Sequence, residues 1–353
     1  MKKILLVTDA WAPQANGVVR VQNAHIAYLK ARGYTIDIIQ PEQFKTVPLL
    51  IIYPEIHLAL FPRRRVARMI NELKPDAIHI MTEGPLGWAA RSICLKREIP
   101  FTTWYHSQYQ LYVDVRLRGL LHPVDFLLRR FHSAAVRTMV STESLKKDLE
   151  LKGFKNVVVV PLGVDIELFV RNPSPTTLPS LQKPVFVYFG RLAVEKSPEE
   201  FLKLELPGTK LVLGDGPLRR KLEKKYPEAF FFGRYEVGKK FVDLLSLCDV
   251  FVFPSRTETF GLVVLEALAC GIPVAAHNVM GPRDSITEGE DGYLNENLRE
   301  AALACLNLSP TDCRKKAERY SWEHSVDAFV KNLFFIRRDS PSRVVRGDGL
   351  SEE

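Results

Sequence analysis

The stretch PSRTETFGLVVLEALACGIPV, residues 254–274, decides the fold. An unbroken apolar run, VFVFP, leads into it and is typical of a parallel strand buried on both faces. A short polar loop with Glu258 and then an apolar helix follow, so the loop lies at the carboxyl end of a sheet, where open α/β folds bind ligands. Glu266 comes about two helical turns later, near the face of Leu262. Helix N-termini at such an edge favour anionic ligands.

Two glutamates taken alone are more often solvated surface residues. Here the turn, the helix and the strand GIPV after it form one compact unit. The stretch resembles the Glu-x7-Glu signature of the retaining glycosyltransferases of family 4, which have the GT-B fold. The resemblance implies that Glu258 holds the donor sugar hydroxyls and Glu266 the ribose hydroxyls. It also implies that the loop between them, Thr259, Phe260, Gly261 and Leu262, contacts the donor.

A second pair of charges stands at the strand-to-helix turn of PVFVYFGRLAVEKSPEEFLKL, residues 184–204. As isolated charges, Arg191 and Lys196 would most often be surface residues. At the end of a strand they suit a diphosphate whose charge grows as the glycosidic bond breaks. Gly190-Arg191 and Lys196 resemble the family's Gly-Arg-Leu…Glu-Lys motif, which assigns both cations to the donor diphosphate. By the same resemblance Gly214 and Arg234, at the ends of the next two strands, lie at the nucleoside.

The first strand, residues 2–10, runs into a loop and an amphipathic helix that Gly33 ends. Asn16-Gly17 marks the turn, where glycine lets the backbone approach a phosphate, although a plain structural turn is the commoner case. The family usually has Gly-Gly there, and Asn-Gly resembles its glycolipid and mannosyl transferases, as do EGPLG and YHS. His106 ends the strand 101–107. A lone histidine is more often structural, but this one resembles the family's histidine beside the donor sugar, where it hydrogen-bonds rather than shuttles protons.

The length of 353 residues predicts two domains. With the resemblance, we expect an α/β protein of the GT-B fold, with two Rossmann-like, doubly wound domains facing across a cleft. The boundaries that we expect are an acceptor-binding domain at 1–170, a proline-rich linker at 171–184, a nucleotide-sugar-binding domain at 185–320, a helix at 321–336 that packs back on the first domain, and a disordered tail at 337–353.

The excess positive charge lies in the first half of the chain. Residues 1–170 hold 23 Lys and Arg against 15 Asp and Glu, whereas residues 171–353 hold 26 of each. The segment 115–140 carries five arginines among apolar residues. It is either an ordinary core helix with a basic face or a patch that lies on anionic lipid, which Arg63–Arg65 and Arg68 extend. No nucleic-acid-binding motif accompanies the charge, so we expect no nucleic-acid partner.

Several absences bound the function. Five cysteines without CxxC spacing indicate a reduced, cytosolic protein without a disulfide framework or a zinc site. The basic segment of the first half adds the expectation of peripheral contact with the inner face of the cell membrane. MKKILLVTDAW reads as a first strand rather than a signal peptide, and no apolar run is long enough to span a membrane. No Asp-x-Asp pair occurs, which argues against a metal on the diphosphate. We expect no cofactor beyond the GDP- or UDP-linked sugar that is the substrate.

The resemblance therefore implies retaining transfer of a hexose, of the mannose or glucose type, from a nucleotide sugar to a lipid or saccharide acceptor at the membrane surface. Two alternatives stay open. One is another enzyme of the same fold, such as an epimerase or a phosphorylase. The other is a non-catalytic protein that uses its basic half to bind membrane or nucleic acid.

Overall fold

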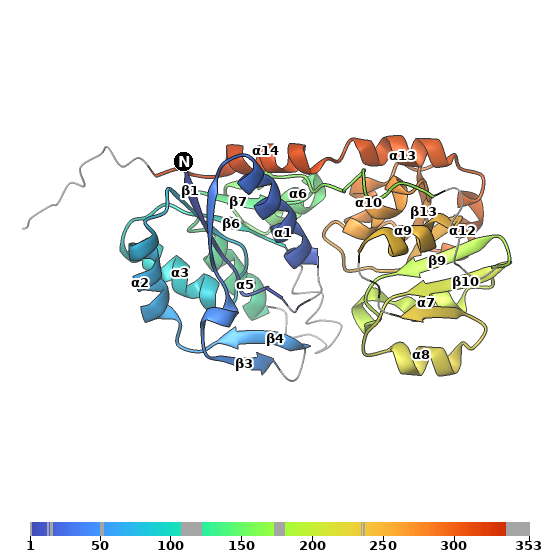
Figure 1. Ribbon diagram of the computed structural model, residues 1–353, viewed down its shortest axis with the longest axis horizontal. Helices are drawn as coiled ribbons and strands as arrows, with labels where there is room; N and C mark the ends of the chain where they lie inside the picture. The colour runs from blue at the N-terminus through green and yellow to red at the C-terminus, as the bar shows by residue number, and fades with distance from the viewer. Residues whose placement is uncertain are drawn as a thin grey trace, which may run out of the picture.

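The computed structural model describes residues 2–12, 14, 17–49, 53–106, 122–172, 181–233, 235 and 237–336. These residues form two sheets of six parallel strands, each covered by helices, and the two α/β units lie side by side (Figure 1). The strand orders are β2-β1-β5-β6-β7-β8 and β11-β10-β9-β12-β13-β14. We call the units built on these sheets the first and the second domain. The predicted pair of α/β domains is confirmed.

The strands of the first domain are short and mostly buried, as their apolar runs predict. They are β1 (Lys3–Val7), β2 (Thr35–Ile39), β5 (Ala77–Ile80), β6 (Thr102–Trp104), β7 (Arg137–Val140) and β8 (Val157–Val159). All of their pairings are parallel, so the loops that follow these strands gather at one edge. That edge carries His106, directly after β6.

Helices cover both faces of the first sheet. On one face, α2 (Arg63–Leu73), α3 (Pro85–Lys96) and α5 (His122–His132) share one core with the strands. On the other face, α1 (Gly17–Ala31) packs with α14 (Trp322–Asn332), which returns from the end of the second domain (Figure 1). The chain also contains α6 (Glu143–Leu151), whose leucines pack against β7, β8 and α5.

Two features of the first domain differ from the sequence analysis. An antiparallel hairpin, β3 (Thr46–Leu49) with β4 (Tyr53–Ala59), lies before α2 and was not predicted. The basic segment 115–140 is not one helix, because α5 ends at His132 and β7 begins at Arg137. Arg137 donates to the carbonyl of Asn332 over 3.2 Å, so it contacts α14 and not a free basic surface. The part of this segment before residue 122 lies outside the described residues.

The second domain repeats the same plan. Its strands are β9 (Val185–Phe189), β10 (Thr209–Leu213), β11 (Phe230–Gly233), β12 (Val250–Phe253), β13 (Val274–Ala276) and β14 (Gly292–Leu294). Every residue of β9 and β12 is buried, as the runs VFVYF and VFVF predict for central parallel strands.

The helices of the second domain divide between its two faces. One face is covered by α7 (Pro198–Lys203), α8 (Arg219–Lys225) and α12 (Leu298–Cys305). The other is covered by α9 (Lys239–Ser246), α10 (Leu262–Ala269) and α13 (Pro310–Glu318). The short α11 (Pro282–Ser285) follows β13. None of the helices in the described part of the chain has the length and apolarity needed to cross a membrane.

Helix α14, the last helix of the described residues, packs against α1, the first. The Nε2 atom of His25 in α1 lies 2.9 Å from the hydroxyl of Ser325 in α14. Beside it, the guanidinium of Arg32 donates to the Asp327 carboxylate over 2.6 Å. The ring of Phe329 lies 4.9 Å from the ring of His25, centroid to centroid. Helix α14 is therefore part of the core of the first domain.

Candidate functional site

The loop between β12 and α10 is held in place by hydroxyl groups at its start. Ser255 and Thr257 both donate to the backbone carbonyl of Glu195, over 3.4 and 3.0 Å. Glu195 belongs to a short 3₁₀ turn, η2 (Val194–Lys196), which follows β9. Two loops from neighbouring strands are thereby joined at the carboxyl edge of the second sheet.

The same two loops share an ion pair. The ammonium of Lys196 in η2 contacts the Oε1 atom of Glu258. Both side chains are largely buried, with exposed fractions of 22% and 14%. Ser255 lies 3.4 Å from the same carboxylate oxygen. The predicted diphosphate cation and the predicted sugar-binding carboxylate are therefore neighbours.

Gly261 makes the sharp entry into α10 possible. Its φ is +83°, in the left-handed region that side chains rarely adopt, and a Cβ atom there would lie 3.3 Å from the ring of Phe253. The ring of Phe260 is buried in the core, so the backbone of the turn, rather than this side chain, lies at the helix start. The left-handed turn at Gly261 thus ends the loop and lets α10 begin at Leu262, four residues after Glu258.

Arg191 lies two residues after the end of β9, where hydrogen bonds to backbone carbonyls fix the loop. Gly190 donates to the carbonyl of Leu213 over 3.0 Å, and the hydroxyl of Tyr188 donates to the carbonyl of Arg191 over 2.8 Å. A Cβ atom on Gly214 would lie only 2.0 Å from the carbonyl oxygen of Gly190. Because the two loops touch through their backbones, Gly214 is required to bring β9 and β10 together here.

His106, of the first domain, contacts the loop between β12 and α10. Its carbonyl accepts a hydrogen bond of 2.9 Å from the Thr259 hydroxyl, and its ring stacks on Trp104 with centroids 4.9 Å apart. The Nε2 atom is buried and has no hydrogen-bond partner among the described residues. Burial, together with His25 and His132 nearby, lowers the pKa of His106 to about 3. The imidazole is therefore neutral at physiological pH.

Further contacts cross from one domain to the other. Ser141, after β7, donates to the carbonyl of Thr259 over 3.4 Å. The amide of Ser144, in the first turn of α6, donates to the Asp284 carboxylate over 3.2 Å. The start of α1 faces the start of α10, since a Cβ atom on Gly17 would lie 3.9 Å from Leu262 Cδ1. The two strand-end edges thus meet around the loop 255–261.

Glu266 is the most deeply buried charge of the site. Its side chain is 2% exposed, and its Oε1 atom is in an ion pair with Arg20 of α1. The Oε2 atom has no hydrogen-bond partner among the described residues. Burial raises the pKa of Glu266, and the Arg20 charge partly offsets that rise. This carboxylate of the second domain is therefore paired with a cation of the first domain through only one of its two oxygens.

The structure brings together most of the predicted site residues. Gly17, His106, Lys196 and Glu258 meet at the contacts described above, with Thr259 to Leu262 and Glu266, and Gly190, Arg191 and Gly214 lie at the ends of β9 and β10. Asn16 and Arg234 lie outside the described residues.

Sequence reasoning did not find Arg20, Ser141, Ser255 or Asp284 as site residues. One signal pointed to Arg20. It stands near the start of α1, where the helix dipole disfavours a cation, so a compensating acid was to be expected.

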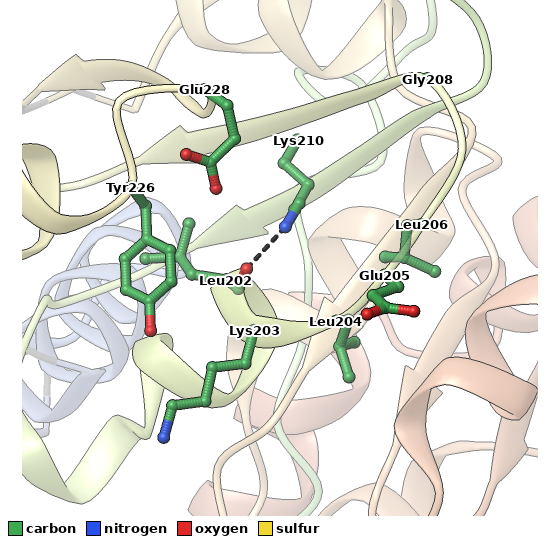
Figure 2. A pocket seen from close by; sticks show the side chains of 9 residues that line it. All are labelled: Leu202, Lys203, Leu204, Glu205, Leu206, Gly208, Lys210, Tyr226 and Glu228. Atoms are coloured by element: carbon green, nitrogen blue, oxygen red, sulfur yellow. Dashed lines mark hydrogen bonds between the residues drawn. The ribbon is translucent and has the colours of Figure 1, made fainter.

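A pocket of about 530 Å³ lies elsewhere in the second domain (Figure 2). Figure 2 shows Lys210 pointing to the carbonyl of Leu202 near the end of α7, to which it donates over 2.5 Å. The lysine thus satisfies a carbonyl that the helix leaves open. No predicted site residue lines this pocket. In the described ranges, no group of three or more His, Cys, Asp and Glu side chains could hold a metal ion.

Comparison with protein families divides the chain as the two sheets do. Residues 15–168 match the model described as Glycosyltransferase Family 4, and residues 174–321 match the model described as Glycosyl transferases group 1.

Curated relatives agree with these matches. The chain is 30% identical over 306 residues to the sulfoquinovosyl transferase SQD2 of Arabidopsis thaliana, covering 77% of this chain and 58% of that protein. It is 27% identical over 322 residues to a GDP-mannose-dependent alpha-mannosyltransferase of Mycobacterium tuberculosis, covering 83% of each. It is also 27% identical to the alpha-monoglucosyldiacylglycerol synthase of Acholeplasma laidlawii, covering 84% of this chain and 85% of that enzyme.

Solved structures share the whole fold. Sucrose-phosphate synthase of Thermosynechococcus elongatus superposes with a TM-score of 0.73 at 18% identity, covering 94% of this chain and 98% of that one. HepE of Anabaena, solved in complex with UDP-glucose, superposes with a TM-score of 0.67 at 16% identity, covering 94% and 99%. The predicted GT-B fold is confirmed. The chain belongs to glycosyltransferase family 4, a family of retaining enzymes that take a sugar from a nucleotide sugar.

Proposed function

We propose that the protein transfers a hexose, of the mannose or glucose type, from a GDP- or UDP-linked sugar to a lipid or saccharide acceptor at a membrane surface, with retention of configuration. One observation carries the proposal. The loop 255–261 contacts Lys196 of its own domain and His106 of the other domain. A cation suited to the diphosphate and polar groups suited to the sugar therefore lie together where the two domains meet.

The donor diphosphate is assigned to the second domain. Arg191 and Lys196 supply positive charge where the leaving group becomes more negative, which is worth most in a partly buried site. Lys196 now pairs with Glu258. When the diphosphate takes Lys196, the Glu258 carboxylate becomes available to the sugar hydroxyls. The amides at the start of α10 and α1 add hydrogen-bond donors for the same anion.

His106 contributes as a neutral ring. With a pKa of about 3 it is not an acid at physiological pH. Its buried Nε2 atom has no partner among the described residues, and an unpaired buried polar group is costly unless a ligand satisfies it. We assign this nitrogen to a hydroxyl of the transferred sugar.

A membrane surface as the place of transfer is supported by one side of the first domain. The helices α2, α3 and α5 cover the same face of the first sheet (Figure 1). Phe61, just before α2, is 94% exposed, and Phe126, in α5, is 55% exposed. We call this side the basic helical face. It comprises Leu60, Phe61, Arg63, Arg64, Arg65, Arg68, Leu95, Phe126, Leu127, Arg129 and Arg130, all exposed.

Such a face fits an anionic bilayer. Aromatic and leucine side chains enter the headgroup region, while arginines contact lipid phosphates at about 1 kcal/mol each. The same face brings the first domain next to acceptors that reside in the membrane. The name of the Acholeplasma relative, a monoglucosyldiacylglycerol synthase, supports a diacylglycerol acceptor, and the mycobacterial relative supports a mannose donor.

Two measurements test the proposal. The unfolding temperature of the purified protein is measured with GDP, UDP, ADP and their sugar conjugates, since a ligand that binds only the folded state raises stability as RT ln(1 + [L]/Kd). The preferred sugar conjugate is then incubated with vesicles that contain diacylglycerol, and the anomeric configuration of the product is determined. Transfer with retention supports the proposal. No stabilisation and no transfer with any conjugate would overturn it.

A further inference from the structure

The ion pair between Arg20 and Glu266 joins α1 of the first domain to α10 of the second, across 246 positions of the sequence. Glu266 is almost fully buried, whereas the Arg20 side chain is 36% exposed. A carboxylate at such depth is stable as an anion only if a counter-charge or several hydrogen bonds accompany it. Among the described residues, Arg20 is the only group that supplies either to Glu266.

The two oxygens of Glu266 differ in their surroundings. Oε1 accepts from Arg20, and Oε2 is buried with no hydrogen-bond partner among the described residues. A buried carboxylate oxygen without a donor costs free energy that a ligand hydroxyl would recover. The family resemblance of the sequence implies that Glu266 receives the ribose hydroxyls of the donor. Resting on that role and on the proposed function, Oε2 is the oxygen left for a ribose hydroxyl.

We infer that Arg20 is a positioning residue for the donor: it holds Glu266 through Oε1, presents Oε2 to a ribose hydroxyl, and thereby makes nucleotide binding depend on contact between the two domains. Arg20 itself does not touch the reacting atoms. It acts on the donor through the carboxylate of the opposite domain.

The electrostatic surroundings make this role separable from a general effect on the fold. In the part of the chain that the structure describes, the groups that interact with the Glu266 carboxyl are Arg20, the Tyr235 hydroxyl and the Cys270 thiol. Burial raises the pKa of both Tyr235 and Cys270, the latter to about 12, so both stay neutral near physiological pH. Arg314 of α13 bonds to the nearby Ala269 carbonyl and not to the carboxylate. Loss of Arg20 therefore leaves Glu266 without a cation and raises its pKa further.

The test compares Arg20→Met with the wild type and with Arg32→Met. Arg32 follows the same helix and also pairs with a carboxylate, that of Asp327, but on α14 and away from the cleft. Dissociation constants are measured by calorimetry for the nucleoside diphosphate, GDP or UDP, that stabilises the wild type, and for its 2′,3′-dideoxy analogue. Measurements run from pH 6 to pH 9, and unfolding temperatures without nucleotide show that each variant is folded.

We expect the wild type and Arg32→Met to prefer the ribonucleotide at every pH. Arg20→Met should bind the ribonucleotide at least about tenfold more weakly at pH 7 and lose most of its preference over the dideoxy analogue. Its affinity should recover as the pH rises and Glu266 ionises. Arg20→Lys, which keeps the charge, should restore part of the affinity and flatten the pH profile.

Three results would overturn the inference. In one, Arg20→Met keeps the affinity, preference and pH profile of the wild type. In another, Arg20→Met binds more tightly, which would mean that Arg20 competes with the ribose. In the third, the wild type itself binds both nucleotides equally, which removes the ribose contact. A wild type that binds no nucleotide or nucleotide sugar would instead overturn the proposed function.

Discussion

The hydroxyl of Thr259, in the second domain, donates a hydrogen bond of 2.9 Å to the backbone carbonyl of His106, in the first. The carbonyl of the same threonine accepts from Ser141, also in the first domain, over 3.4 Å. One residue of the loop after β12 is thus fixed to two strand ends of the opposite sheet. The position of His106 relative to Glu258 depends on this residue, so its hydroxyl is a direct test of whether domain contact supports catalysis.

Thr259→Val keeps the shape of the side chain and removes the donor. The lost bond is worth about 1 kcal/mol, so we expect turnover to fall about fivefold. Initial rates with a saturating sugar nucleotide measure this change. The matched control is Thr209→Val, since Thr209 donates to the carbonyl of Gln182 over 2.8 Å at the start of β10, away from the site. The control should lower stability but not turnover. Unchanged rates in Thr259→Val would show that the bond has no catalytic role.

A larger effect on turnover is expected for the two cations assigned to the donor diphosphate. Replacing Lys196 by Met, or Arg191 by Ala, should lower turnover by about 10²- to 10³-fold, because each removes a charge that is needed most in the transition state. Kinetics at several donor concentrations separate turnover from KM.

Lys183→Met serves as the control for these two variants. Lys183 also pairs with a carboxylate, that of Asp249, over 2.8 Å, but it is 56% exposed and lies before β9. We expect its turnover to match the wild type. Near-wild-type turnover in both Lys196→Met and Arg191→Ala would reject the diphosphate assignment.

Most of the fold could be predicted because its central strands are short apolar runs with glycine or proline at their ends. VFVYF in β9 and VFVF in β12 are fully buried, and a strand buried on both faces has a distinctive composition. The hairpin β3–β4 has no such signal, since Pro48 interrupts its first strand. β7 was missed because its four residues, RTMV, continue the basic pattern of α5 and are too few to show a period of their own.

The site was predictable where one strand-loop-helix unit contains it. Lys196 and Glu258 follow neighbouring strands of one sheet, so topology alone brings them to one edge. The pair of Arg20 and Glu266 depends on how two domains face each other, which no local pattern encodes. The same reason explains why Ser141 and Asp284 were missed: one is an ordinary loop residue and the other an ordinary residue of the short helix α11 until the opposite domain is in place.

Buried histidines predict how stability depends on pH. Burial lowers the pKa of His25 and of His106 to about 3, and lowers that of His79 well below its ordinary value. The unfolded chain binds these protons near pH 6.5 and the folded chain does not. The contribution of these histidines to the free energy of unfolding is therefore fully present above pH 6.5 and is lost progressively as the pH falls towards 3. Each histidine contributes a slope of at most about 1.4 kcal/mol per pH unit.

Buried acids act in the opposite sense. Burial raises the pKa of Asp9 to about 6, so its contribution grows as the pH falls from 6 to below 4 and partly offsets the histidines. Replacing one histidine isolates its own contribution to the pH dependence of the free energy of unfolding. We expect urea unfolding between pH 7 and pH 5 to show a smaller loss of stability for His25→Gln than for the wild type. His324→Gln, at an exposed position of α14, should keep the wild-type slope. Equal slopes for all three proteins would contradict a neutral, buried His25.

The basic helical face gives the last prediction. Phe61→Ser with Phe126→Ser should weaken binding to vesicles that contain anionic lipid by about tenfold or more, because each exposed ring would otherwise bury apolar surface in the headgroup region. Co-sedimentation measures the bound fraction. Phe230→Ser is the control, since Phe230 is 50% exposed but lies on β11 of the second domain. Arg64→Ser with Arg68→Ser should reduce the dependence of binding on salt, because fewer phosphates are contacted. If neither pair of changes affects binding, or if the control weakens it equally, the membrane contacts the protein through another surface.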